Sequence, residues 1–226
     1  MSSFDTIWNE IYETGHVNRY PWDAVVSFVF RNAPKDRARD EIVIMEVGCG
    51  GANNLWFCAR EGFQTVGVDA SPEALNLARK RFAEDQLAGE FLEQDFTNLS
   101  LEDNSVDLVI DRAALTCTPY SVMCKTINEI HRVLKPGGKF LFIPYGDSHS
   151  SAASGHLDTK EKMVKGINRG TLVDVGQITF LSVNDIKTLF SKGWTLEQLE
   201  RAENTDLLTP EFGLHSEYRV IARKEV

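Results

Sequence analysis

Short apolar segments alternate with amphipathic segments along most of this chain. Ile42–Val47 is a continuous apolar run in which Ile42, Val43, Ile44 and Val47 are β-branched, as expected of a strand covered on both faces. Residues 54–62 then show helical character and end at a glycine. The same alternation continues to the C-terminus and predicts an α/β fold. The further strands are expected at 65–72, 91–96, 106–110, 139–143, 194–203 and 216–224, with helices from Ser71, at 126–134 and at 182–190.

The region before the first strand is expected to be helical. Phe4, Ile7, Trp8, Ile11 and Tyr12 recur at helical spacing, and 23–30 reads as a second helix after a loop. This aromatic stripe indicates a segment that packs on the domain or covers a site.

Composition limits the classes of protein to consider. At 226 residues the chain suits one domain, 1–226, with a single well-buried core. A net charge of −9 argues against a nucleic-acid partner, because phosphate binding needs a basic surface. No apolar run has the length of a membrane span, and no signal peptide is recognisable. The four cysteines, without C-x-x-C spacing, indicate reduced thiols and a cytoplasmic location.

A glycine turn follows the first strand. Gly48 and Gly50 let backbone N–H groups approach a ligand, and the next helix adds its positive N-terminal end. A dinucleotide site would have a third glycine where Asn53 stands. Glu46 would also repel a pyrophosphate, although it can orient a cationic ligand.

Four ordered signals resemble class I S-adenosylmethionine-dependent methyltransferases. Glu46, Gly48 and Gly50 match the family's first motif, with Ala52 in place of its last glycine. Asp69, the Asp95-Phe96 pair and the Leu134–Gly138 turn, which is structural in the family, follow in order. The resemblance covers about residues 42–224. It implies a doubly wound seven-stranded, mostly parallel sheet with an antiparallel last strand and a helical N-terminal lid over residues 1–40.

The resemblance also implies which residues bind S-adenosylmethionine, with S-adenosylhomocysteine as product. Asp69 lies about 20 residues after the glycines, the spacing of an acid that reaches ribose hydroxyls. Asp95 and Phe96 are expected at the adenine, although a simple turn at the strand end is an open alternative. In the lid, Arg19 could pair with the ligand's carboxylate, and Tyr12 and Tyr20 could face its sulfonium. The remaining expected contacts are Gly48, Cys49, Gly50, Asn53, Ala70, Ser71, Asp111 and Arg112.

Candidate catalytic residues come from two places. Asp111 emerges at a strand end and could be a general base, a metal ligand or a partner of Arg112. One acid does not make a metal site, so no metal is expected. Residues 146–180 are expected to form a substrate-side insertion, in which His149 or His156 could deprotonate an acceptor hydroxyl. Disorder without a role is the alternative for the start of this segment.

The predicted activity is methyl transfer to a small-molecule acceptor, such as a sugar or a biosynthetic intermediate. The alternatives are a protein or RNA methyltransferase, an inactive methyltransferase-like partner, and an NAD-dependent oxidoreductase. No membrane partner is expected, and the pattern does not fix an oligomeric state.

Overall fold

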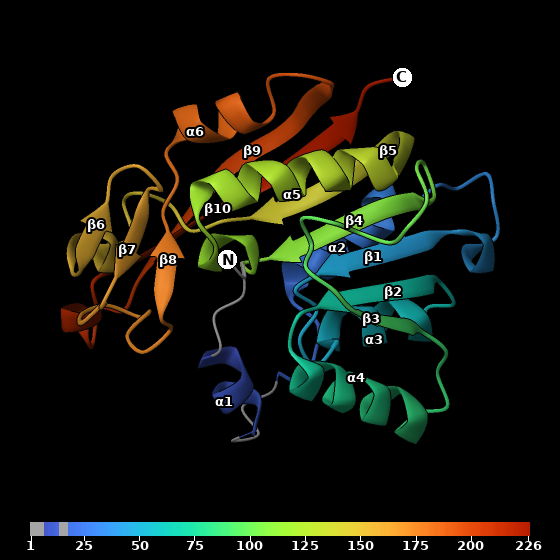
Figure 1. The fold of residues 1–226 in the computed structure, drawn as a ribbon, viewed down its shortest axis with the longest axis horizontal. Helices are drawn as coiled ribbons and strands as arrows, with labels where there is room; N and C mark the ends of the chain where they lie inside the picture. Colours follow the sequence, from blue (N-terminus) through green and yellow to red (C-terminus); the bar gives the residue numbers. More distant parts are fainter. Residues whose placement is uncertain (1–6, 14–17) are drawn as a thin grey trace.

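A seven-stranded sheet forms the centre of the protein (Figure 1). The computed structural model describes residues 7–13 and 18–226. The strand order is β3-β2-β1-β4-β5-β10-β9, and the first five strands in this order are parallel to one another. Both the sheet and its order of strands confirm the predicted class. The strands are β1 (Val43–Val47), β2 (Gln64–Asp69), β3 (Glu90–Glu93), β4 (Val106–Arg112), β5 (Leu134–Ile143), β9 (Trp194–Thr205) and β10 (Leu214–Lys224).

The last two strands form a long antiparallel hairpin. β10 inserts between β5 and β9 and pairs antiparallel with both. This confirms the antiparallel last strand expected from the chain's ending. It also carries the first residues of β10 past the end of β5, to the edge of the sheet where ligands bind in open α/β folds.

Helices cover both faces of the sheet, as the apolar runs required (Figure 1). Within β1, Met45 and Val47 join the core under α5 and α6, whereas Ile44 joins the core under α2, α3 and α4. The helices are α1 (Ile7–Glu13), α2 (Asp23–Asn32), α3 (Asn53–Arg60), α4 (Pro72–Glu84), α5 (Tyr120–Val133) and α6 (Val183–Leu189), with 3-10 turns η1 (Arg39–Glu41), η2 (Leu115–Cys117), η3 (Ser150–Ala153) and η4 (Pro210–Phe212). Among the described residues, no helix is long and apolar enough to cross a membrane.

The Pro-Gly-Gly turn lies inside a strand instead of before one. We expected residues 136–138 to separate the helix from the fifth strand. Instead, α5 ends at Val133 and β5 begins at Leu134. The register of the β4–β5 pairing changes between Val106 and Leu108 of β4, and Gly137 of β5 has a φ of +78°. Proline and glycine therefore form an irregularity at the start of the strand.

Residues 146–180 are structured, which overturns the alternative of disorder. After η3, three short strands form a separate antiparallel sheet: β6 (His156–Asp158), β7 (Met163–Lys165) and β8 (Gln177–Thr179). Val164, Ile178 and Phe180 bury a small apolar cluster beside Cys117 of η2. The insertion is thereby fixed against the edge of the main domain.

Replacing Phe140 should destabilise the protein strongly. Its ring is fully buried in β5 and contacts Phe142, Phe190 and Trp194. We expect Phe140→Ala to lower the free energy of unfolding by about 3–5 kcal/mol, measured by urea denaturation. Leu208→Ala, at a 92% exposed side chain, is the control and should change it by less than about 0.5 kcal/mol. A loss below about 1 kcal/mol for Phe140→Ala would contradict this view of the core.

Candidate functional site

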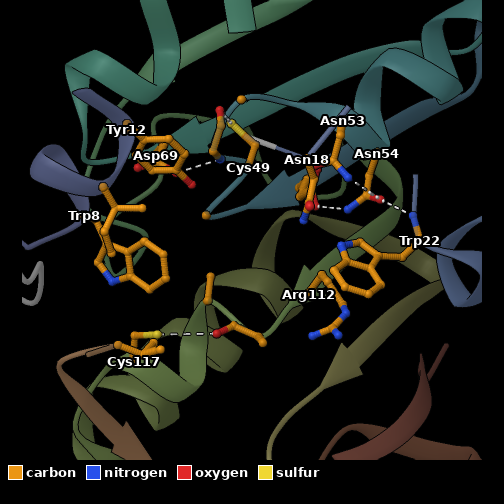
Figure 2. Close-up of a pocket in the computed structure, with 18 of the residues that line it drawn as sticks. Trp8, Tyr12, Asn18, Trp22, Cys49, Asn53, Asn54, Asp69, Arg112 and Cys117 are labelled. Atoms are coloured by element: carbon orange, nitrogen blue, oxygen red, sulfur yellow. Dashed lines mark hydrogen bonds between the residues drawn. The ribbon is translucent and has the colours of Figure 1, made fainter. Parts of the chain in front are cut away.

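A cavity of about 660 Å³ opens at the carboxyl ends of the central strands (Figure 2). Its two ends differ in chemistry. We call one the glycine-turn end, formed by Glu46, Gly48, Cys49, Gly50, Asp69 and Phe96. We call the other the histidine end, formed by Arg112, Cys117, Thr118, Tyr145, Thr171 and His215.

The turn after β1 needs its glycines. Gly48 and Gly50 have φ values of +62° and +52°, which favour glycine. A Cβ on Gly48 would lie 2.1 Å from the Cβ of Ala114, and one on Gly50 would lie 2.3 Å from the Tyr12 hydroxyl. The turn is therefore tightly covered by neighbouring elements.

Asp69 is anchored at the end of β2. One carboxylate oxygen accepts a hydrogen bond from the Gly50 N–H (2.8 Å), and the other accepts from the Ser71 N–H (2.9 Å). Burial raises the pKa of Asp69, and these backbone donors oppose that rise. Ser71 caps α4 through its hydroxyl. Ala70 and Ser71 were predicted to be ligand contacts, but they do not line the cavity.

Glu46 is a cavity carboxylate with one oxygen that no described residue hydrogen-bonds. It is buried, and its Oε1 accepts a hydrogen bond from the Asn54 side-chain amide (2.6 Å). Its Oε2 has no hydrogen-bond partner among the described residues. Burial raises the pKa of Glu46 to about 8, although the Asn54 hydrogen bond opposes this rise. Asn54, which the sequence did not single out, also accepts from the Trp22 N–H (3.0 Å) and so ties α3 to the segment before α2.

Phe96 lines the cavity, but Asp95 does not. The Asp95 carboxylate is exposed and accepts hydrogen bonds from the backbone N–H (2.9 Å) and the hydroxyl (2.7 Å) of Thr97. These hydrogen bonds form a turn at the strand end, the alternative to an adenine contact for Asp95.

Asp111 is buried and does not line the cavity. Its Oδ1 accepts from the backbone N–H groups of Ala114 (3.0 Å) and Leu115 (2.9 Å), so it holds the turn into η2. Burial raises the pKa of Asp111 to about 7. The structure therefore does not place this acid where a general base would act, and the ion-pair partner of Arg112 is another acid, Glu217.

Arg112 does line the cavity, where it lies beside Trp22 (Figure 2). Its guanidinium lies 4.2 Å from the centre of the Trp22 ring, and its Nη2 lies 3.2 Å from Glu217 Oε2. Stacking and pairing fix the guanidinium while leaving it at the cavity wall.

The N-terminal segment contributes to the cavity with other residues than expected. Tyr12 lies over the glycine turn beside Asp69 (Figure 2), and burial raises its pKa. Arg19 and Tyr20 are exposed and do not line the cavity. The Tyr20 backbone carbonyl accepts a hydrogen bond from the side chain of Asn53 (2.8 Å), which does line it. Trp8, Ile11, Asn18 and Trp22 line it instead, and Phe4 lies outside the described residues.

The two candidate histidines of the insertion have different positions. His156 is exposed on β6 and does not line the cavity. His149 is buried behind the histidine end, and its Nε2 lies 3.2 Å from Nδ1 of His215. His215 reaches the cavity itself, as does Tyr145. His215 and Tyr145 were not predicted, because each lies in a part of the chain that carries no local motif.

Comparison with known proteins identifies this arrangement. Residues 44–138 match the sequence profile of the methyltransferase domain family. This segment holds β1 to β4, the glycine turn, Asp69 and Phe96. The match and the relatives below support a class I S-adenosylmethionine-dependent methyltransferase.

The relatives that this chain resembles have varied names. A provisionally named methyltransferase of Geobacillus sp. (strain WCH70) is 29% identical over 147 residues, which are 62% of this chain and 56% of that protein. Malonyl-[acyl-carrier protein] O-methyltransferase of Pectobacterium atrosepticum is 27% identical over 117 residues, 52% of this chain and 44% of the relative. The chain thus spans about half the length of these curated relatives.

Solved structures support the fold. An S-adenosylmethionine-dependent methyltransferase from Methanosarcina mazei superposes with a TM-score of 0.70 at 19% identity, covering 84% of this chain and 96% of that one. A phosphoethanolamine N-methyltransferase of Haemonchus contortus, in complex with S-adenosylhomocysteine, has a TM-score of 0.67 at 19% identity, covering 97% of this chain and 57% of the other.

The residues of the glycine-turn end fit S-adenosylmethionine. The unpartnered Glu46 oxygen offers an acceptor for a ligand ammonium group, and Asp69 presents a fixed carboxylate beside backbone that carries no Cβ. In the described parts of the chain, no three His, Cys, Asp or Glu side chains gather as a metal site would require.

Proposed function

We propose that this methyltransferase transfers the methyl group of S-adenosylmethionine to a small-molecule acceptor held in the histidine end. The observation that supports this most strongly is the single cavity that joins a nucleotide-type turn to a second, chemically different end. Its volume of about 660 Å³ is within the range of sites that enclose small ligands.

The residues of the glycine-turn end suit separate parts of the cofactor. Asp69 would accept from the ribose hydroxyls, and Phe96 would pack against the adenine. Glu46 would pair with the ammonium of the methionine moiety, since that carboxylate has one buried oxygen without a partner. The Gly48–Gly50 backbone would lie against the ligand, and Tyr12 would cover it.

Catalysis by this chain would come largely from positioning and exclusion of water. S-adenosylmethionine, when bound, supplies a methyl group on a cationic sulfur that is a good leaving group. Trp8, Tyr12 and Trp22 enclose the cavity from the N-terminal segment, and Leu172 and Val175 enclose it from the insertion. Holding an acceptor in line within such a site removes most of the entropic cost of a reaction between two molecules.

A small acceptor agrees with the surroundings of the cavity. Two relatives are named as methyltransferases of malonyl-[acyl-carrier protein] and of phthiotriol dimycocerosates. A third, from Saccharomyces cerevisiae, is named as a tRNA(Thr) methyltransferase and is 21% identical. RNA is disfavoured here because the chain carries a net charge of −9. The small polar and apolar groups at the histidine end offer contacts for a compact ligand.

Labelling tests the proposal directly. Purified protein is incubated with methyl-labelled S-adenosylmethionine and a size-fractionated native lysate. We expect label in the small-molecule fraction, at a rate above that of heat-denatured protein. Label confined to macromolecules would favour a protein or RNA acceptor. Binding of S-adenosylhomocysteine without labelling of any fraction would instead favour an inactive, methyltransferase-like partner.

A further inference from the structure

Two histidines and a threonine meet at the histidine end of the cavity. Thr171 Oγ1 lies 3.2 Å from His149 Nε2 and 3.0 Å from His215 Nδ1. His149 is 1% exposed, whereas His215 and Thr171 line the cavity. His149 precedes η3, Thr171 lies between β7 and β8, and His215 lies in β10, so the tertiary fold brings them together.

The proton positions in this group follow from one backbone hydrogen bond. The Ser151 N–H donates to His149 Nδ1 (3.0 Å), so a neutral His149 carries its proton on Nε2. Burial and the neighbouring His215 lower the pKa of His149 to about 4, which keeps it neutral. His149 Nε2–H then donates to Thr171 Oγ1, and the Thr171 hydroxyl donates to His215 Nδ1.

An acid is placed to stabilise a protonated His215. His215 and Glu217 lie two residues apart in β10 and therefore on the same side of the strand. Glu217 Oε2 lies 3.8 Å from His215 Nε2. Burial would raise the pKa of Glu217, but the contacts with His215, Arg112 and Arg219 lower it below its usual range. His215 therefore has a carboxylate on the far side of its ring from Thr171.

From this geometry we propose that His215 is the general base of the reaction, that Thr171 relays the acceptor proton to it, and that His149 is a positioning residue. The proposal rests on the proposed function and adds a class of acceptor to it, a hydroxyl on an apolar ring.

The proton transfer balances within the site. The acceptor O–H bond breaks and its proton passes to Thr171 Oγ1, while the Thr171 hydroxyl proton forms a new N–H bond at His215 Nδ1. The electron pair left on the acceptor oxygen then forms the bond to the transferred methyl carbon. The bond from that carbon to sulfur breaks, with its pair staying on sulfur. Glu217 faces the positive charge left on His215.

The walls of the histidine end favour a hydroxyl over other acceptors. Arg112, held by Trp22 and Glu217, presents guanidinium N–H donors at the wall, and such donors suit a developing oxyanion. A carboxylate acceptor is already ionised and needs no base. Tyr145, Trp22, Leu172 and Val175 supply flat and apolar surface that suits a ring.

The charged and titratable neighbours of His215 come from several elements. Glu217 of β10 lies beside His215. Arg219 of β10 and Arg112 of β4 each form an ion pair with Glu217. The segments around β5 and η3 contribute Tyr145 and His149, with ring centres 5.7 and 4.9 Å from that of His215. The β9 residue opposite His215 is the neutral Asn204. Glu217 is thus the nearest counterion for His215.

The probe for this proposal is 4-nitrophenol, a small ring hydroxyl that is coloured only when ionised. It is added to the protein saturated with S-adenosylhomocysteine, so that no turnover takes place. We expect the bound probe to ionise at least one pH unit below the free probe, a tenfold change in its ionisation equilibrium. Calorimetry with S-adenosylhomocysteine comes first, because absence of that binding would count against the proposed function, whereas binding without probe ionisation would overturn only the base.

Variants separate the base from its surroundings. His215→Gln and Thr171→Val should each lower the ionisation constant of the bound probe about tenfold, whereas Thr171→Ser should retain the wild-type constant because it keeps the hydroxyl. His156→Gln, at an exposed histidine that the structure places outside the cavity, is the matched control and should leave it unchanged. Equal ionisation in wild type and His215→Gln would overturn the proposal, as would failure of the saturated wild type to ionise the probe.

Discussion

Asp69→Ala should weaken the binding of S-adenosylhomocysteine by more than tenfold. A charged hydrogen-bond acceptor contributes about 1.5–3 kcal/mol, which corresponds to a loss of about 10- to 150-fold in affinity. The expectation is strengthened by the anchoring of this carboxylate, because Gly50 and Ser71 N–H groups fix both of its oxygens. The substitution therefore removes the ligand's partner, a hydrogen bond that holds the glycine turn and a hydrogen bond to the start of α4.

Calorimetric titration measures the Asp69 effect, and two further variants define its origin. Glu90→Gln removes an exposed carboxylate from β3 and should leave the affinity unchanged. Asp69→Asn keeps the shape of the side chain and should lose less affinity than Asp69→Ala. If Asp69→Ala bound the product as tightly as wild type does, the assignment of this acid to the ligand would be wrong.

Stability of the ligand-free protein should fall as the pH rises from about 5 to about 8, because of Glu46. The pKa of this carboxyl is about 8 in the folded protein and 4.5 ordinarily, so between these values the folded state holds a proton that the unfolded state has lost. The free energy of unfolding then decreases by about 1.4 kcal/mol per pH unit from this group. The contribution is fully present below about pH 4.5 and is lost on passing about pH 8.

Glu46→Gln should remove that slope. Urea denaturation at several pH values is the measurement, and the difference between wild type and variant isolates Glu46 from Asp111, whose raised pKa acts in the same direction. Glu73→Gln, at the start of α4, is the control and should leave the slope as in wild type. Parallel pH profiles for wild type and Glu46→Gln would contradict the buried, protonated state of this acid.

The glycine-turn end was largely predictable because its residues lie at the carboxyl ends of consecutive strands. Gly48 and Gly50 follow β1 and Asp69 ends β2, and parallel strands bring their carboxyl ends to one edge of the sheet. Phe96 reaches the cavity by the same rule. The sheet itself follows from alternating apolar runs, so the fold and this half of the site could be inferred together.

The histidine end could not be predicted because distant segments assemble it. Tyr145, Thr171 and His215 follow no shared motif, and only the insertion of β10 beside β5 brings His215 to the cavity. His156 was singled out for its residue type, but pairing in β6 places it on the surface. Asp111 was singled out for its place at a strand end, yet two backbone N–H groups bind its carboxylate within the turn. Local hydrogen bonds of this kind are not visible in the sequence pattern.

A crystal structure with S-adenosylhomocysteine tests most directly whether one cavity holds cofactor and acceptor side by side. The account predicts both ribose hydroxyls within about 2.6–3.2 Å of the Asp69 carboxylate and the ligand ammonium at Glu46 Oε2. It also predicts that the sulfur faces the histidine end, toward Tyr145 and Thr171. A ligand bound elsewhere, or one whose sulfur faces away from that end, would contradict it.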